Sequence, residues 1–312
     1  MNLEGEIRIG TRGSELALVQ ARLVAERIRK RYPERPVEIV PIRTRGDRMQ
    51  DIALVQIGGK GVFVKEIEET LLRCEISIAV HSMKDVPVDL PAGLEISVVP
   101  EREDPRDVLI ARGKRKLEEL PRGARIGTGS LRRKMQLLNL LSDIEVVPIR
   151  GNLGTRIGKM ETEGLDGIIA AAAGMRRMGW VREVSQFIPT EIMLPAACQG
   201  VIGIEVRSDD ETMKEAVSFL NHPETSMAVS AERAFLRRLG GGCQVPIACM
   251  AKRERDTLII RGAVGNTTGR IIIADEVRGD CREAEHLGIE LAEIILSRGG
   301  KAVLESVYGS ES

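Results

Sequence analysis

The sequence of 312 residues predicts an α/β fold in which two similar α/β domains flank a cleft and a small α+β domain follows. Strand-like apolar runs alternate with helix-like periodicity, as they do in sheets with parallel strands. This alternation occurs twice, on either side of the charged segment "EREDPRD" at 101–107. After residue 244, three strand-like segments follow one another directly, which predicts a three-stranded antiparallel sheet.

The first predicted domain begins with a strand at "EIRIGT" and a helix that Ser14 is expected to cap. The helix ends before Pro33 and has one apolar face. The residues of this face are Leu16, Val19, Leu23, Val24 and Ile28. Further strands are predicted at "VEIVPIRT", "ISIAVHS" and "LEISVVP", and a helix after "GGKG" carries Phe63, Ile67 and Leu71 at helical spacing.

The second predicted domain repeats this pattern. The strand "ARIGTGS" leads into the helix "LRRKMQLLNLL", and the strand "EVVPIR" leads through "GNLGTR" into another helix. The run "GIIAAAAG" is interpreted as one unbroken strand, followed by "MRRMG". A later strand, "VIGIEVR", has no helical layer of its own, so we expect it to return to the first sheet.

The third predicted domain starts after helices at 211–220 and 223–239. Its strands are "VPIACMA", "TLIIRGAVG" and "RIIIADEVRG", and a final helix places Ala284, Leu287, Leu291 and Ile294 on one face. The predicted boundaries are 1–100 with 201–218 for the first domain, 106–195 for the second and 222–312 for the third.

Composition excludes several classes of function. The 46 basic and 46 acidic residues balance, and aromatic residues make up 2% of the chain, which argues against binding of nucleic acid. No apolar run approaches the roughly 20 residues that span a bilayer, and no signal-like segment opens the chain, so we expect a cytoplasmic protein. Five cysteines without CxxC spacing and three histidines predict reduced thiols, structural histidines and no metal site.

Polar or small residues follow four of the predicted strands, at 11–14, 81–85, 127–130 and 150–152. Ligands of open parallel sheets bind at the carboxyl ends of the strands, so we expect these clusters to face one cleft. Helix capping is the alternative for "GTRGS" and "GTGS", and "GGKG" lacks the earlier glycine of a P-loop. Arginines lie in or near these loops: Arg12, Arg132, Arg133, Arg150, Arg156 and Arg177. Unpaired cations at one rim would predict a polyanionic ligand.

Two further residues are candidates for chemistry. Asp85 lies among these cations, where it would stay ionised and could stabilise a positive charge, although a turn or cap role is the common alternative. Cys243 follows three glycines, so it is either a small packed residue or a thiol presented on a flexible loop.

At "HSMKDVP", "GTGSLRR", "RGNLGTR" and "GGCQVPIA" the sequence resembles the porphobilinogen deaminases, or hydroxymethylbilane synthases, from about Ile7 to the final helix. The resemblance implies a monomeric enzyme that condenses four porphobilinogen molecules head to tail, releases ammonia and finally hydrolyses off hydroxymethylbilane. It implies a dipyrromethane cofactor joined by a thioether to Cys243. Each pyrrole carries acetate and propionate groups, so the arginines would balance a growing polyanion.

The resemblance also implies roles for individual residues. Asp85 matches the catalytic carboxylate, which would hydrogen-bond pyrrole N–H groups, stabilise the azafulvenium cation formed as ammonia leaves and assist proton transfer. The matches to cofactor contacts are Ser82, Lys84, Asp85, Thr128, Ser130, Arg132, Arg133 and Arg150. The matches to substrate contacts are Arg12, Ser14, Gln20, Arg156, Arg177 and Gln199, with Lys60 of a lid-like loop as a looser candidate.

Three residues depart from the common family pattern: Glu15, Gln56 and Cys198. None removes a required group. The paired α/β domains also resemble the type II periplasmic-binding-protein architecture, so a non-catalytic protein that binds small anions is the main alternative. A thiol hydrolase or redox sensor that uses Cys243 is a second alternative, but the sequence shows no histidine partner near it.

Overall fold

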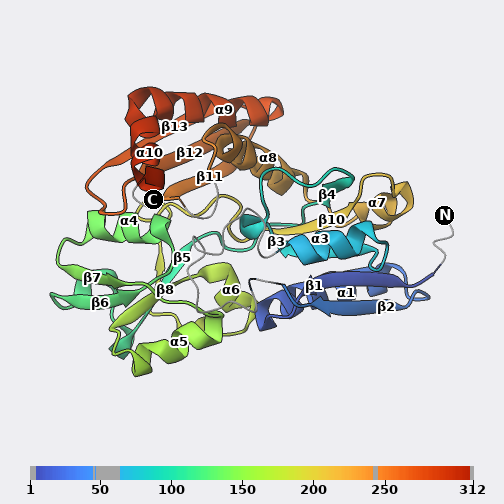
Figure 1. The fold of residues 1–312 in the computed structure, drawn as a ribbon, viewed down its shortest axis with the longest axis horizontal. Coiled ribbons are helices and arrows are strands. Elements are labelled where there is room, and N and C mark those ends of the chain that lie inside the picture. Colours follow the sequence, from blue (N-terminus) through green and yellow to red (C-terminus); the bar gives the residue numbers. More distant parts are fainter. Residues whose placement is uncertain (1–4, 45, 47–63, 242–244, 310–312) are drawn as a thin grey trace. The chain divides into compact units, whose positions relative to one another are not determined.

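The computed structural model describes residues 5–44, 46, 64–241 and 245–309 (Figure 1). The chain divides into two compact units, which are described separately below. The first unit consists of Met1–Glu103 and Val201–Ser226, and the second consists of Asp104–Gly200 and Met227–Ser312. In the described part of the chain, no helix is long and apolar enough to cross a membrane.

The first unit contains a five-stranded sheet with the order β2-β1-β3-β10-β4. Its strands are β1 (Ile7–Arg12), β2 (Val37–Ile42), β3 (Ile78–Ser82), β4 (Leu94–Val98) and β10 (Ile202–Arg207). Its helices are α1 (Glu15–Arg31), α3 (Lys65–Leu72) and α7 (Glu211–Ser218). Strand β1 runs parallel to β2 and β3, whereas β10 runs antiparallel to β3 and β4. The prediction that "VIGIEVR" returns to the first sheet is therefore confirmed.

Helices α1 and α3 pack on opposite faces of this sheet. Ile78 and Val80 of β3 join the core formed with α1, whereas Ala79 joins the core formed with α3. This alternation follows from the two-residue period of a strand. The predicted apolar face of α1 was wrong at Leu23, which is 42% exposed. Its place toward the sheet is taken by the small residues Ala21 and Ala25, which let the helix approach closely.

The second unit contains a sheet of similar design, with the order β7-β6-β8-β5-β9. Its strands are β5 (Asp107–Ala111), β6 (Ala124–Gly127), β7 (Ile144–Val147), β8 (Gly167–Ala171) and β9 (Gln186–Ile188). Its helices are α4 (Leu131–Leu140), α5 (Leu153–Thr162) and α6 (Ala172–Arg177). Strand β10 of the first sheet runs antiparallel to β3, and strand β5 of the second sheet runs antiparallel to β8. Each of these two strands begins shortly after the point where the chain enters its unit, at Val201 for β10 and at Asp104 for β5.

The predicted strand "GIIAAAAG" was wrong in its second half. Strand β8 ends at Ala171, and α6 begins at Ala172. Alanine has a high helix propensity and is equally suited to a buried strand, so the run gives no periodicity that marks this boundary. Strand β5 and the short edge strand β9 were not predicted.

A three-stranded antiparallel sheet, β11 (Ile247–Glu254), β12 (Thr257–Gly265) and β13 (Ile272–Asp280), lies in the C-terminal part of the chain, as predicted. The accompanying helices are α8 (Pro223–Arg238), α9 (Ala284–Ile295) and α10 (Lys301–Gly309). Helix α9 buries Ala284, Leu287 and Leu291, three of the four members of the predicted apolar face, whereas Ile295 is buried in place of the partly exposed Ile294. The division of the chain into three domains with the boundaries given above stays a prediction.

Candidate functional site

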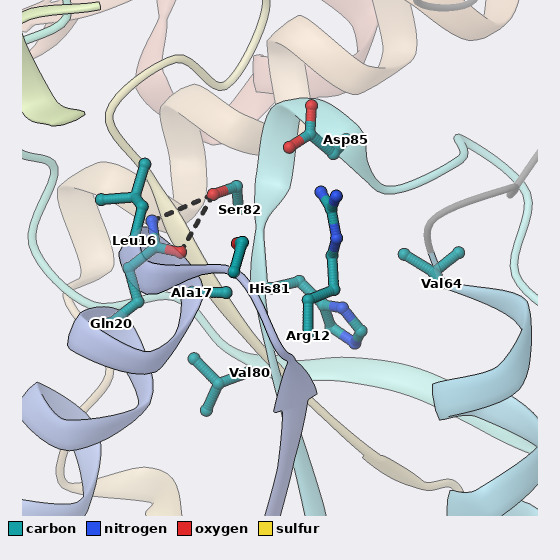
Figure 2. A pocket seen from close by; sticks show the side chains of 10 residues that line it. Arg12, Leu16, Ala17, Gln20, Val64, Val80, His81, Ser82 and Asp85 are labelled. Carbon is teal, nitrogen blue, oxygen red and sulfur yellow. Dashed lines mark hydrogen bonds between the residues drawn. The ribbon is translucent and has the colours of Figure 1, made fainter. Parts of the chain in front are cut away.

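A pocket in the first unit brings together five of the predicted site residues (Figure 2). They are Arg12, Ser14, Gln20, Ser82 and Asp85, and the remaining lining residues are Leu16, Ala17, Val64, Val80 and His81. The first three come from the end of β1 and the first part of α1, Ser82 is the last residue of β3, and Asp85 lies in the turn that follows it. Because β1 and β3 are parallel neighbours, their carboxyl ends meet at the same edge of the sheet.

The junction between β1 and α1 turns polar side chains toward the pocket. Arg12 is the last residue of β1, and Ser14 occupies the N-cap position of α1 with an extended backbone. The predicted capping bond is not formed, since the Ser14 side chain caps no backbone group in the described residues. Figure 2 shows the Arg12 side chain extending from β1 toward Asp85. The junction thus supplies a guanidinium and a hydroxyl to one wall of the pocket.

Gln20 and Ser82 connect α1 to β3 at the pocket wall. The Gln20 amide donates from Nε2 to Ser82 Oγ at 2.9 Å, and Gln20 Oε1 lies 3.1 Å from the same hydroxyl. Gln20 is buried although it is polar, so this contact satisfies its hydrogen-bonding groups. The two residues were assigned to opposite sides of the site, substrate and cofactor, yet they form one contact.

Asp85 is positioned by the turn that follows β3. Residues Met83–Asp85 form a 3-10 helix, and the Met83 backbone N–H donates to Val201 O at 3.0 Å. The buried Met83 side chain lies so close to Gly203 of β10 that a Cβ there would be 2.1 Å from its sulfur. A side chain at 203 would therefore displace the Met83 side chain, which belongs to the turn that carries Asp85. Lys84 belongs to the same turn but is not among the residues that line the pocket.

His81 is a pocket residue that the sequence analysis treated as structural only. Its Nε2 lies 2.8 Å from Glu205 Oε2, and both side chains are buried. Burial and the charge of Glu205 raise the pKa of the nearby Glu68 from 4.5 to about 7. His81, which lines the pocket, thus belongs to a buried group of ionisable side chains. The only sequence signal was that His81 directly precedes the polar turn after a buried strand.

Arg132 and Arg133 lie in the second unit and are not the unpaired cations that the sequence analysis expected. Both are buried and share the carboxylate of Asp107, which has no exposed surface. Arg132 Nη1 lies 2.7 Å from Oδ2, and Arg133 Nη2 donates to Oδ1 at 2.7 Å. Burial alone would raise the pKa of Asp107, but the two guanidinium groups hold it well below its usual range. The prediction failed because Asp107 had been included in the polar segment 101–107, although it begins the apolar strand "DVLIA".

Thr128 and Ser130 form the turn between β6 and α4. Thr128 Oγ1 accepts a hydrogen bond from the Ser130 backbone N–H at 3.2 Å, and Ser130 Oγ accepts one from the Arg133 N–H at 3.4 Å. Between them, a Cβ on Gly129 would lie 2.6 Å from the Ile149 carbonyl oxygen. The "GTGS" spacing therefore combines helix capping with a close backbone approach, and each hydroxyl oxygen accepts one backbone hydrogen bond.

The other predicted residues of the second unit lie in two helices and in the segments before α5 and β10. Arg150 follows β7 and is partly buried, and Arg156 on α5 donates from Nε to Gly151 O at 2.8 Å. Arg177, at the end of α6, donates from Nη2 to Gly200 O at 2.7 Å. Next to that glycine, Gln199 donates from Nε2 to Asp107 Oδ1 at 3.0 Å. Arg132, Arg133 and Gln199 are thus brought together around one carboxylate.

Two predicted residues, Cys243 and Lys60, lie outside the described residues. Within the described ranges, no group of three or more histidine, cysteine or carboxylate side chains could hold a metal ion. The expectation that both sets of residues face one cleft stays a prediction, because each set belongs to a different unit.

The two sets differ in what they can do chemically. The pocket of the first unit offers a carboxylate, a guanidinium, hydroxyls and an amide to a small polar molecule. The cluster of the second unit contains two cations and one anion, so it has an excess positive charge. Each set by itself suits a ligand group of a particular kind: the pocket suits N–H donors and carboxylates, and the cluster suits an anionic group.

Comparisons with known proteins agree with this chemistry. The family model described as "Porphobilinogen deaminase, dipyromethane cofactor binding domain" matches residues 7–215, and the model of the C-terminal domain of porphobilinogen deaminase matches residues 226–297. The porphobilinogen deaminase of Syntrophus aciditrophicus is 55% identical over 299 residues, which cover 96% of this chain and 98% of the relative. That of Geobacter metallireducens is 52% identical over 98% of this chain and 96% of the relative.

Among solved structures, the chain has a likeness to the periplasmic aliphatic sulphonate binding protein SsuA from Escherichia coli. The likeness has a TM-score of 0.40 at 15% identity and covers 75% of this chain and 70% of that one. The sequence matches extend over both units, and they favour the enzyme over the non-catalytic anion-binding alternative. The chain belongs to the porphobilinogen deaminase family.

Proposed function

We propose that this protein is a hydroxymethylbilane synthase, a transferase that condenses four porphobilinogen molecules and releases ammonia at each addition. The observation that carries the proposal is the pocket in which Asp85 lies with Arg12, Ser14, Gln20 and Ser82. It contains the one carboxylate that family resemblance assigns to catalysis, next to side chains assigned to the substrate. We further propose that the protein acts in the cytoplasm as a monomer and has no nucleic-acid partner.

Asp85 is proposed as the catalytic residue. Porphobilinogen must lose ammonia before a new carbon–carbon bond forms, and positive charge develops on its pyrrole as the amine departs. A carboxylate at the pocket stabilises that charge and accepts a hydrogen bond from the pyrrole N–H. Arg12 and Ser14, which line the same pocket, would bind the acetate and propionate groups of the incoming ring. Removal of ammonia then leaves the substrate oriented by its carboxylates.

The second unit fits a bound dipyrromethane cofactor. Arg132 Nε and Gln199 Oε1 are buried and have no hydrogen-bond partner among the described residues. An unpaired guanidinium N–H suits a carboxylate, and an unpaired amide oxygen suits a pyrrole N–H. When bound, the cofactor supplies the terminal pyrrole carbon to which the first substrate ring is joined. We propose Ser82, Lys84, Thr128, Ser130, Arg133 and Arg150 as further contacts, and Arg156, Arg177 and Lys60 on the substrate side.

Cys243 is proposed to hold the cofactor through a thioether. Substitution of Cys243 by Ser removes the nucleophilic sulfur and should give a folded protein without a covalent adduct, as measured by intact-mass spectrometry. Cys249→Ser, at a buried cysteine of β11, is the matched control and should keep the adduct.

Activity with porphobilinogen tests the proposal as a whole. The purified protein should release ammonia and hydroxymethylbilane in a ratio of about four to one, as the condensation requires. A non-catalytic anion-binding protein would bind porphobilinogen without releasing ammonia. Absence of ammonia release from protein that carries the adduct would contradict the proposed function.

A further inference from the structure

The carboxylate of Asp107 joins three predicted site residues that are far apart in the sequence. Arg132 and Arg133 come from the first turn of α4, and Gln199 comes from the segment before β10. Besides the contacts given above, Arg133 Nε donates to Asp107 Oδ1 at 3.1 Å. Oδ1 thus accepts from both Arg133 and Gln199, while Oδ2 faces Arg132.

The backbone of Asp107 is held on both sides. Asp107 is the first residue of β5, and it pairs with Ala171 of β8 and with Ile188 of β9. Each arginine has a second anchor as well, because Arg132 Nη1 donates to Leu194 O at 2.7 Å and Arg133 Nη1 donates to Ile169 O at 3.0 Å. The guanidinium groups therefore have fixed directions relative to the sheet.

The charges of this cluster do not cancel. Two buried guanidinium groups repel each other strongly in a medium of low dielectric constant. A carboxylate between them attracts both groups, and this attraction offsets their mutual repulsion. One positive charge remains. Arg132 Nε and Gln199 Oε1 are buried and form no hydrogen bond with the described residues, and Asp107 Oδ2 has the ion pair with Arg132 but no hydrogen bond.

We propose that Asp107 is a positioning residue, which orients Arg132, Arg133 and Gln199 and leaves them one net positive charge for an anionic ligand group. This inference rests on the proposed function, since it assigns these three residues to the cofactor and substrate. Asp107 would touch neither of them. It acts through the side chains that it binds. These are Arg132 and Arg133, which are proposed to contact the cofactor, and Gln199, which is proposed to contact the substrate.

A second carboxylate provides a matched control. Asp104 also binds two arginines, Arg106 at 2.7 Å and Arg176 at 3.2 Å, but its side chain is 9% exposed and both arginines are partly exposed. Arg106 and Arg176 pack over the Phe187 ring and belong to no predicted site. Asp104→Asn therefore removes the same charge from a carboxylate that two arginines share, three residues away from Asp107, without touching Arg132 or Arg133.

The experiment compares full-length Asp107→Asn with Asp104→Asn and the unsubstituted protein. We expect kcat of Asp107→Asn to fall at least about tenfold, with KM for porphobilinogen changed less than about threefold, because two of the three partners are proposed cofactor contacts. Asp104→Asn should keep kcat within about threefold, even where the two variants lose similar thermal stability.

A second measurement is independent of turnover. An arginine-specific dicarbonyl reagent followed by peptide mass spectrometry reports how far Arg132 and Arg133 are shielded. Both should be protected in the unsubstituted protein and in Asp104→Asn, and should react at least about tenfold faster in Asp107→Asn because their anchor is lost. If the unsubstituted protein made no bilane, the proposed function would fail, while this protection would still test the role of Asp107.

Equal kcat for Asp107→Asn and Asp104→Asn, with Arg132 and Arg133 equally protected in both, would overturn the proposal. If Asp107→Asn does not fold, Asp107→Glu retains the charge but moves the carboxylate by one C–C bond. That variant should keep both arginines protected and still lose at least about fivefold in kcat, since the guanidinium groups shift. Unchanged kcat in a folded Asp107→Glu would also overturn it.

Discussion

Asp85 and Asp107 each lie at one end of a strand, in two sheets of similar design, but they differ in exposure and in the side chains around them. Asp85 is partly exposed, follows β3 and lines a pocket. Asp107 is completely buried, begins β5 and is surrounded by two guanidinium groups and an amide. In the roles proposed here, the difference in exposure separates a carboxylate that acts on a substrate from one that positions other side chains. A buried carboxylate that binds two arginines can orient them, whereas one that lines a pocket can contact a substrate.

The largest expected effect is on catalysis at Asp85. Asp85→Asn removes the negative charge from the pocket and retains the shape of the side chain, so kcat should fall about 100-fold or more. Thermal unfolding should change little, because no buried ion pair is broken. Steady-state ammonia release is the measurement.

Asp89→Asn is the control for that comparison. Asp89 is exposed, lies four residues after Asp85 and does not line the pocket. Its substitution should leave kcat within about twofold. Similar losses in both variants would show that the assignment of Asp85 to catalysis is wrong.

The second effect concerns stability of the cluster around Asp107. Arg133→Gln leaves the buried carboxylate with one arginine, and breaking a buried pair in this way costs about 3 kcal/mol. Arg150→Gln, at a partly exposed arginine of the same unit, should cost less than about 1 kcal/mol. Chemical denaturation measures both. Equal small losses would mean that Asp107 and Arg133 are not coupled.

A third effect is the pH dependence of stability through Glu68. Burial, followed by the charge of Glu205, raises the pKa of Glu68 from 4.5 to about 7 in the folded protein. The stabilisation from its neutral form is therefore complete below pH 4.5 and is lost as the pH rises through about 7. His81 opposes the shift, and Glu69 adds to it slightly.

Glu68→Gln stays neutral at every pH, so its stability relative to the unsubstituted protein should increase between pH 5 and 8, by about 1 to 3 kcal/mol. Chemical denaturation at several pH values gives the difference. Glu69→Gln, on the same helix and exposed, should show no such trend. A difference that is constant with pH would contradict the raised pKa of Glu68.

The smallest expected effect is on the free energy of unfolding, and it compares Ser14, which lines the pocket, with Asn152, which caps a helix. Ser14 forms no capping bond in the described residues, whereas Asn152 Oδ1 accepts from the Thr155 N–H at 2.8 Å at the start of α5. Ser14→Ala should therefore cost less than about 0.5 kcal/mol, and Asn152→Ala about 1 kcal/mol. Denaturation measures both. A larger loss for Ser14→Ala would show that its hydroxyl stabilises α1 after all.

Much of the fold could be predicted from the sequence, because the spacing of apolar residues indicates which segments form strands and which form helices. The apolar runs of β3 and β10 and the alternation of strand and helix indicated both sheets, and the return of β10 followed from the lack of a helix beside it. Boundaries inside "GIIAAAAG" could not be predicted, because alanine is compatible with a buried strand and with a helix. The edge strand β9 has three residues, too few to show a period.

The site was predictable where residues are close in sequence and not where they meet only in space. Ser82 and Asp85 lie within one motif, and Arg12, Ser14 and Gln20 lie within another, so their convergence needed only two parallel strands. The pairing of Asp107 with Arg133 and Gln199 spans 26 and 92 positions. No local pattern indicates such a contact, and a count of arginines cannot show which of them are neutralised.

The most direct test of the account is a time course of intact masses after mixing the adduct-bearing protein with porphobilinogen. The account predicts a series of species that differ by one pyrrole unit each, and in Asp85→Asn a single species that keeps only its two-pyrrole adduct. A series that builds at an unchanged rate in Asp85→Asn would contradict the claim that this carboxylate carries the reaction.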